Sequence, residues 1–505
     1  MEINNNKNCC RFGLPDGKTT AIKTPLCIIL GIGFGAVLIY SLITEFYFYQ
    51  AVIAGILIVP VIASFFIYSP RKSLLALLSF TIPFNPSFHI VSTTSFEFSM
   101  GLNFWTSDLI VILIFIYLLI SNSTEKERKY NPSGSFWQLG LPLLLWIVIG
   151  VFSFIPAVNK NIVPIELVRM LRIFLIFFAV YKLVDKPEDA RIIVYFLILA
   201  FSIQTLLVIM EYCTGHSLIR LPGEAREVEL VGGDMFRSSG SMGHSSNYAK
   251  LAALSIPICL AYIFAARKSI WRICVSLILI AGLVALVLTI SRAGIIATIF
   301  GLSWAFLLIS KKTNLQHKEI KIIVLVILLF IGIGLAWITG GDRLISRVKW
   351  DYGSASSRPQ MFSVAWNVIK KHAFLGVGLN NYTLVAPNYD RTANAISVEF
   401  PHPVHNIYLL YAAEMGMPGA IVFIWFLLGT ISKAFKHSLD VKFTFDSIIL
   451  KAIGVGITCS WLQGLIGWGH RSSIVHTSYL AMIAGMLSAS SYYYQKSRVD
   501  KNIES

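Results

Sequence analysis

The stretch that decides the fold is "HNIYLLYAAEMGMPGAIVFIWFLLGTIS", residues 405–432, in which Glu414 is the single acidic side chain and neither Lys nor Arg occurs. A run of this kind predicts a helix that crosses a bilayer, because a hydrocarbon core of roughly 30 Å takes about 20 apolar residues in helical form. Similar runs recur along the chain, which is 56% hydrophobic and 13% charged. Soluble domains carry roughly a quarter charged residues, so the sequence predicts an all-α polytopic membrane protein.

We expect about 12–14 transmembrane helices of this length. The expected spans are 24–43, 48–68, 73–90, 106–121, 136–158, 166–184, 190–212, 245–266, 270–290, 293–310, 319–339, 405–432, 446–468 and 474–494. They form one membrane domain over 24–494, between cytoplasmic tails 1–23 and 495–505. The first span follows a polar segment and lacks a small-residue cleavage signature, so we expect it to be a retained anchor.

Charge fixes the expected orientation. Lys and Arg gather in every second short loop, as in 126–129, 267–272 and 311–318, and basic loops stay cytoplasmic. Both termini are then cytoplasmic, and two long segments, 213–244 and the large loop 340–404, lie outside the cytoplasmic membrane. The net charge of +16 reflects this topology and predicts no nucleic-acid partner, although attraction to anionic membrane lipid remains open.

Arginines on the outer side oppose the topological bias and are therefore candidate site residues. Arg169 and Arg172 lie three apart at the outer end of 166–184 and share a helix face, and Arg237 lies in the first outer segment. In "TISRAGIIATIFGL", 289–302, Arg292 stands between two spans. It either snorkels to the interface or contacts an anion there, and several such cations around one cavity predict a polyanion, most simply a diphosphate.

The stretch "SASSRPQMFSVAWNVIKKHAFLGVGLNNY", 354–382, predicts an amphipathic helix in the large loop. Its apolar side chains share one face, from which we expect the helix to lie along the outer membrane surface. Arg358 falls in the first turn, where the helix dipole disfavours a cation. Either an anion binds beside Arg358 or the side chain is simply solvated. Gly376 and Gly378 predict a tight turn back toward the bilayer.

Two histidines precede the span that starts at 405. His402 and His405 flank Pro403, and Asn406 follows. A neutral imidazole at the lipid surface suits a general base near pH 7, although interfacial polar residues also occur without a catalytic role. Glu414 is an intramembrane carboxylate and hence a functional candidate, or it fixes a kink before Gly416.

Arginine between spans, arginine at the start of an amphipathic helix and "HN" entering a span resemble, in this order, the superfamily of O-antigen ligases and Wzy-type polysaccharide polymerases. The resemblance covers roughly 237–435, and "SRAG", "GVGLNNY" and "HNIYLLYAAEMGMPG" carry it best. "RSSGSMGHSSNYAKLAAL", 237–254, resembles the segment that opens the central helices of the family, with Ser246-Asn247 in place of the common Pro-Asn.

The resemblance implies a GT-C-like, metal-independent, inverting glycosyltransferase without a cofactor. Its donor is a glycan on undecaprenyl diphosphate and its acceptor a glycan or lipid A-core, at the outer face of the inner membrane. Carried over by position, Arg292 and Arg358 would hold the diphosphate and His405 would activate or position the acceptor. Arg169, Arg172, Arg237, His402, Asn406 and Glu414 are the further expected substrate contacts. Ligase and polymerase remain open in lipopolysaccharide or exopolysaccharide synthesis.

Two other classes compete with the enzyme. A flippase for the same lipid-linked glycan would carry ionisable residues near the bilayer midplane, for which Lys250 and Lys451 are candidates. A structural scaffold would not need the outer cations. The sequence contains no phosphate-cradling glycine motif and no Ca²⁺-loop pattern, and its seven cysteines lack metal-ligand spacing, so we expect no metal site.

Overall fold

The computed structural model describes residues 68–84, 87–91, 102–122, 133–215, 229–231, 235–266, 269–310, 357–440, 444–467, 469 and 474–504. The expected spans 24–43 and 319–339, nearly all of 48–68, the tail 1–23 and the first part of the large loop, 340–356, lie outside these residues. The chain divides into two compact units, Met1–Leu77 and Leu78–Ser505, and the description below concerns the second.

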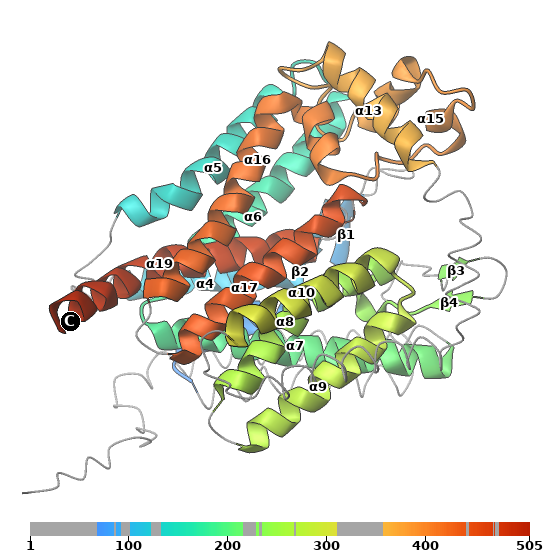
Figure 1. The fold of residues 1–505 in the computed structure, drawn as a ribbon. Helices are drawn as coiled ribbons and strands as arrows, with labels where there is room; N and C mark the ends of the chain where they lie inside the picture. Colours follow the sequence, from blue (N-terminus) through green and yellow to red (C-terminus); the bar gives the residue numbers. More distant parts are fainter. Residues whose placement is uncertain are drawn as a thin grey trace, which may run out of the picture. The chain divides into compact units, whose positions relative to one another are not determined.

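The described part is helical in the main, as expected (Figure 1). Its helices are α3 (Pro70–Thr81), α4 (Thr106–Asn122), α5 (Ser133–Phe152), α6 (Val163–Leu183), α7 (Pro187–Thr214), α8 (Ser245–Ala265), α9 (Ser269–Leu288), α10 (Arg292–Ser310), α13 (Arg358–Lys371), α14 (Tyr382–Val385), α15 (Ile396–Glu399), α16 (Ile407–Asp440), α17 (Thr444–Leu462) and α19 (Ile474–Glu504). Single 3₁₀ turns are η1 (Lys160–Ile162), η2 (Gly240–Met242), η3 (Ala386–Tyr389) and η4 (Gln463–Leu465).

Two short hairpins add to the expected helices. Strand β1 (Ser87–Val91) pairs antiparallel with β2 (Leu102–Trp105), with Ser87 opposite Trp105. Strand β3 (Glu229–Val231) pairs with β4 (Met235–Arg237), with Glu229 opposite Arg237. Both lie in connections between helices, so they do not change the polytopic architecture.

Six helices are long and apolar enough to cross a membrane, counted over the described residues. They are Pro187–Thr214, Ser245–Ala265, Ser269–Leu288, Arg292–Ile309, Ile407–Asp440 and Phe445–Leu465. On α16 the side chains of Met417, Ile421, Trp425 and Leu428 are exposed along one face, as expected of a lipid-facing stripe.

The centre of the bundle is a tight trio of α8, α10 and α17. A Cβ on Gly294 of α10 would meet the Cβ of Ala249 in α8, and a Cβ on Gly456 of α17 would meet the carbonyl oxygen of Leu254 in α8. Small residues let membrane helices approach this closely. Because α8 and α10 are linked through the antiparallel α9, their first turns lie at the same end of the bundle.

One expected span was wrong. The span 73–90 fails because α3 ends at Thr81 and residues 87–91 form β1; Pro83 and Pro86 lie between them, and proline removes a backbone donor and stops a helix. At the other end of the chain, α19 continues to Glu504 and so includes most of the expected tail 495–505.

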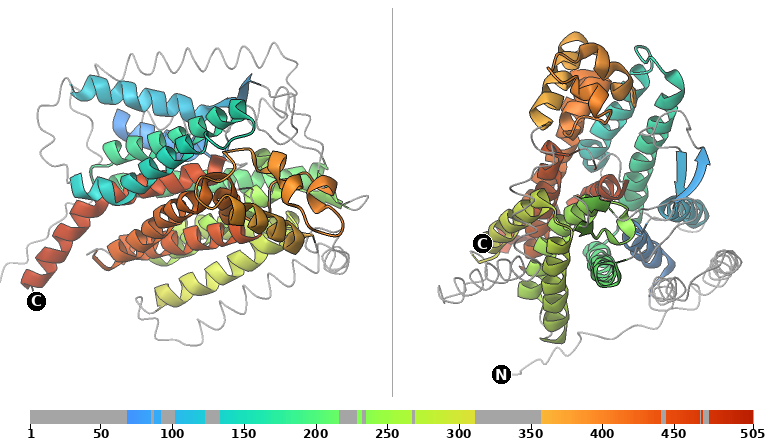
Figure 2. Two further views of the ribbon diagram at one scale, coloured as in Figure 1. Left: turned by 90° about the horizontal axis from the view of Figure 1, so that it is seen from above. Right: turned by 90° about the vertical axis from the view of Figure 1, so that its right-hand side faces the viewer.

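The large loop folds over one end of the helices. Figure 1 and both views of Figure 2 show the segment from α13 to α15, in orange, gathered where α16 begins. The expected amphipathic helix is α13, but its apolar face is not available to lipid. Met361, Val364 and Val368 are buried, and α13 packs on α16, α15 and η3. The expected membrane contact through this face is therefore wrong, because protein covers it.

Candidate functional site

The site is built around the first turn of α16. The Oδ1 atom of Asn406 accepts hydrogen bonds from the backbone N–H groups of Tyr408 and Leu409, both at 3.0 Å. This is N-capping, for which asparagine is among the preferred residues. The hydroxyl of Tyr408 donates to the carbonyl oxygen of Trp461 at 2.8 Å, which ties this turn to the end of α17. Asn406 therefore fixes the start of α16 directly after His405.

His405 lies in a strongly perturbed environment. Burial lowers the pKa of His405 most. The charges of Arg358, His402 and His244 lower the pKa further, whereas a hydrogen bond to the Pro403 carbonyl raises it. The resulting pKa is about 4. The Nδ1 atom is buried and has no hydrogen-bond partner in the described part of the chain. His405 is therefore neutral near pH 7, and Arg358 and His402 are the predicted residues that the fold brings to it.

The predicted turn after α13 is a staple between two elements. Gly376 and Gly378 have positive φ angles of 68° and 94°, and a Cβ on Gly376 would overlap the backbone of Glu414. Gly376 must therefore be glycine, both because its φ angle is positive and because a side chain would overlap this backbone. The N–H groups of Val377 and Gly378 donate to the carbonyl oxygens of Ala413 and Glu414, at 2.9 and 3.0 Å.

Glu414 stabilises this turn. Its side chain is 2% exposed, and Oε2 accepts from the backbone N–H of Asn380 at 3.0 Å. Just beyond it, Gly416 has φ 72° and ψ 174°, which interrupts the helical conformation inside α16. Of the two readings of Glu414 in the sequence, the structure supports the one in which it fixes the break in the helix.

The other half of the staple reaches the connection between α5 and α6. The side chain of Asn381 accepts from the N–H of Asn159 at 2.7 Å and donates to its carbonyl oxygen at 3.2 Å. The N–H of Leu379 donates to the hydroxyl of Ser153 at 3.3 Å. The motif "GVGLNNY" thus joins α16 to α5 and α6. Sequence reasoning identified its glycines but not the asparagines, whose side chains bond to Ile162 and Asn159, more than two hundred residues away.

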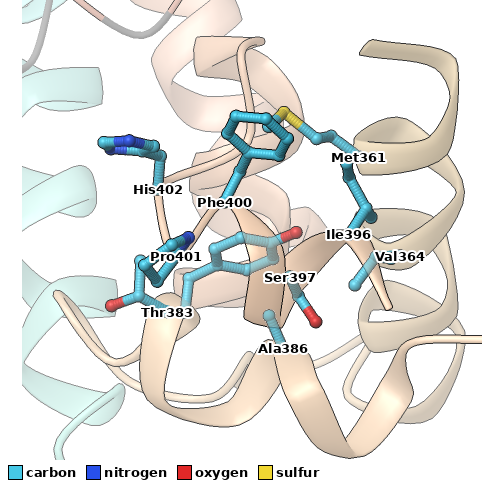
Figure 3. Close-up of a pocket in the computed structure, with 10 residues that line it drawn as sticks. Met361, Val364, Thr383, Ala386, Ile396, Ser397, Phe400, Pro401 and His402 are labelled. Carbon is cyan, nitrogen blue, oxygen red and sulfur yellow. The ribbon is translucent and has the colours of Figure 1, made fainter. Parts of the chain in front are cut away.

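A narrow pocket lies between α13 and the segment before His405. In Figure 3, Met361 and Val364 of α13 face Ile396 and Phe400, while the imidazole of His402 points away from this apolar lining. Asp390 stabilises the loop beside this pocket through hydrogen bonds from Thr392 and Ser397. Burial acts to raise the pKa of Asp390, but hydrogen bonds from the N–H and hydroxyl groups of Ser397 and Thr392 outweigh it, so the pKa falls to about 2.

Arg292 is the first residue of α10 and follows a strained turn. Ile290 has φ 51°, a conformation that a β-branched residue rarely adopts. The turn is held by Arg237, whose Nε donates to the carbonyl oxygen of Thr289 at 3.0 Å, and the hydroxyl of Ser291 accepts from the N–H of Gly294 at 3.3 Å. Arg237 is 7% exposed and stabilises the turn that precedes Arg292.

The two arginines of α6 already have carboxylate partners. Nε of Arg172 lies 2.6 Å from Oδ1 of Asp108, and an Arg169 guanidinium nitrogen lies 3.0 Å from Oε2 of Glu166. These pairs are nearly enclosed, with side-chain exposures of 5–14%. Both arginines remain predictions as diphosphate contacts, but the pairs give them a structural role as well.

Residues 277–424 match the family model described as O-antigen ligase, Wzy_C. The resemblance to the O-antigen ligase family is thereby confirmed. The O-antigen ligase match spans α10, the loop segment and the start of α16, and so contains Arg292, Arg358 and His405. Arg169, Arg172 and Arg237 precede it.

Other comparisons add little. No curated protein matches the chain. A solved chain from a structure described as "Structural coordination of polymerization and crosslinking by a peptidoglycan synthase complex" is 15% identical, with 72% of this chain and 99% of that chain covered and a TM-score of 0.40. A likeness at this level carries no argument.

Proposed function

We propose that the protein is a membrane glycosyltransferase that moves a glycan from a polyprenyl diphosphate, most simply undecaprenyl diphosphate, onto an acceptor sugar. It would act at the outer face of the cytoplasmic membrane in the synthesis of O-antigen or another cell-surface polysaccharide. The acceptor is either lipid A-core, as for a ligase, or a second glycan, as for a polymerase.

One observation carries this proposal: within the O-antigen ligase segment, an imidazole that is neutral near pH 7 lies beside an arginine at the first turn of α13. The acceptor hydroxyl attacks the anomeric carbon while the bond from that carbon to the diphosphate oxygen breaks, and the electron pair stays on the diphosphate. His405 takes the hydroxyl proton, and Arg292 and Arg358 neutralise the leaving group. A single displacement of this kind inverts the anomeric centre and needs no metal or cofactor.

The remaining predicted residues are proposed to act in two ways, by contacting the substrate or by fixing the turns that carry the site. His402 is proposed to contact the sugar or the diphosphate, because it lies close to His405. Asn406, Glu414 and Arg237 are proposed to act on substrate chiefly by fixing the turns that present His405 and Arg292.

The test uses purified protein with a polyprenyl-diphosphate oligosaccharide, with and without lipid A-core, and resolves the glycan products by size. A ladder without lipid A-core identifies a polymerase, and a single shift that requires lipid A-core identifies a ligase. His405→Ala should abolish either product. His372→Ala is the matched control, because the His372 imidazole pairs with the hydroxyl of Tyr389 at 2.6 Å, away from the α16 turn. Equal activity of His405→Ala and wild type would refute the assignment.

A lipid-linked glycan flippase is the second candidate, and one observation favours it. Lys250 is 3% exposed inside the membrane-spanning α8, where its Nζ donates to Oδ1 of Asn247 at 3.3 Å. Ionisable residues within spans mark transport pathways as well as catalytic sites. Translocation of a labelled donor in vesicles without any glycan product, unaffected by His405→Ala, would establish the flippase instead.

A further inference from the structure

The start of α8 carries an imidazole, His244, that the proposed mechanism does not use. His244 is the N-cap of α8, where its Nδ1 accepts from the backbone N–H of Ser246 at 3.1 Å. Histidine is not among the preferred N-cap residues, whereas the two serines that follow are. The residue is also exposed, although α8 is buried from Asn247 to Ala261. A simple cap does not explain this choice of side chain.

The first turn of α8 is next to the turn that carries Arg292. The contact of Ala249 with Gly294 sets the two parallel helices side by side within their first two turns. The segment that leads to His244 is also joined to the preceding turn, through the hydrogen bond from Arg237 to Thr289. His244 and Arg292 therefore open neighbouring parallel helices, and helix N-termini favour anions.

The same turn of α8 is next to the start of α16. The end of α17 contacts α16, because Trp461 accepts the hydrogen bond from Tyr408. The segment after η4 contacts α8, because a Cβ on Gly469 would meet Nζ of Lys250 and lie 3.4 Å from Oδ1 of Asn247. In agreement with this arrangement, charge on His244 contributes to the lowered pKa of His405. His244 is thus close enough to His405 for its charge to act there, and it opens the helix that packs on α10, the helix that begins with Arg292.

The N-cap hydrogen bond determines which nitrogen of the His244 ring carries the proton. Because a backbone N–H donates to Nδ1, that nitrogen carries the lone pair, and the proton of the neutral ring lies on Nε2. We propose that His244 contacts the substrate and that its Nε2–H donates a hydrogen bond to the departing diphosphate. This inference rests on the proposed function. No proton is transferred: His244 stabilises the oxygen charge that forms as the glycosyl bond breaks, and His405 alone accepts the hydroxyl proton.

The test separates the cap from the donor. His244→Asn and His244→Ser keep a side-chain oxygen that caps α8 but have no group at the position of Nε2. Both should keep the wild-type melting temperature and lower the turnover number about 10²-fold, as for loss of one donor to a developing oxyanion. They should also bind polyprenyl diphosphate more weakly than wild type in the absence of acceptor. His372→Asn, which removes an imidazole already paired with Tyr389, should leave both unchanged.

The outcomes are distinct. Wild-type turnover and diphosphate affinity in both variants would overturn the role of His244 and leave the proposed function intact. A raised KM for the acceptor with unchanged turnover would also overturn it, since His244 would then contact the acceptor. No product from the wild-type protein, under conditions in which it binds polyprenyl diphosphate, would refute the proposed function; diphosphate affinity equal in wild type and His244→Asn would refute this inference separately.

Discussion

The pH dependence of glycan transfer gives the sharpest test of the site, because the structure gives His405 a pKa of about 4 in place of the usual 6.5. A general base must be neutral, so activity is present above its pKa and is lost as the pH falls through it. At pH 5 a group with pKa about 4 is about 90% neutral, whereas one with pKa about 6.5 is about 3% neutral. Transfer at pH 5 should therefore be within about a factor of two of that at pH 7.5.

The charges around His405 predict the direction in which variants move this limb. Arg358 and His402 lower the pKa of His405, with Arg358 the larger cause and His244 a smaller one. Removing a cation stabilises the imidazolium and raises the pKa, so the acid limb should move to higher pH in His402→Gln and further in Arg358→Gln. Both phosphoryl groups of the donor are esterified, so their charges do not change over this range.

The assay measures initial rates of product formation from pH 4 to pH 8 on detergent-purified protein, normalised for each variant to its own maximum. Samples held at low pH are returned to pH 7.5 to show that the loss is reversible and does not reflect unfolding. A wild-type limb near pH 6.5, or limbs that coincide in wild type and Arg358→Gln, would refute the assignment of His405 as the base in this environment.

Three further changes test the supporting contacts. Arg172→Met should destabilise the protein by about 3 kcal/mol, because it removes the cation that pairs with the nearly enclosed Asp108 carboxylate. Arg172→Met with Asp108→Leu should recover the melting temperature and activity, and a stable but inactive double variant would instead place Arg172 on the substrate. Asn406→Ala should cost about 1 kcal/mol through loss of the cap while Asn406→Asp should not, as measured by denaturation. Chelation of divalent metal by EDTA should leave transfer rates unchanged, and restoration of a lost rate by Mg²⁺ would contradict the metal-independent mechanism.

Much of the fold could be predicted because bilayer physics acts on each span separately. The apolar runs that begin near 106, 190, 245, 270, 293 and 405 appear as helices that start within a few residues of the expected positions, although α16 continues past 432 to Asp440. The failure at 73–90 has a local cause that was visible, two prolines at 83 and 86, but the hydropathy of the window outweighed them in the prediction. Length and polarity determine that a segment is helical, and backbone chemistry determines where it ends.

The site could be predicted in part for a different reason. Arg292, Arg358 and His405 carry unusual chemistry for their positions, so the sequence indicates them without any knowledge of their partners. His244 was missed because it looks like an ordinary polar residue before a helix. Its relevance depends on the approach of α8 to α10 and α16, which no local pattern shows.

The same distinction explains why the motif "GVGLNNY" contains no group that the mechanism uses. Gly376 admits the backbone of α16 and Gly378 admits Ala157 in the connection after α5. Asn380 and Asn381 bond to Glu414 and Asn159. The turn therefore connects α5, α6 and α16 to the C-terminal end of α13, the helix that carries Arg358 in its first turn. A diphosphate held by cations from separate elements is bound well only if those elements keep their spacing, since misplacement of about 1 Å can cost about 10²-fold in rate. Substitutions in this motif should consequently lower turnover and melting temperature together, whereas substitutions of Arg292 or His405 should lower turnover alone.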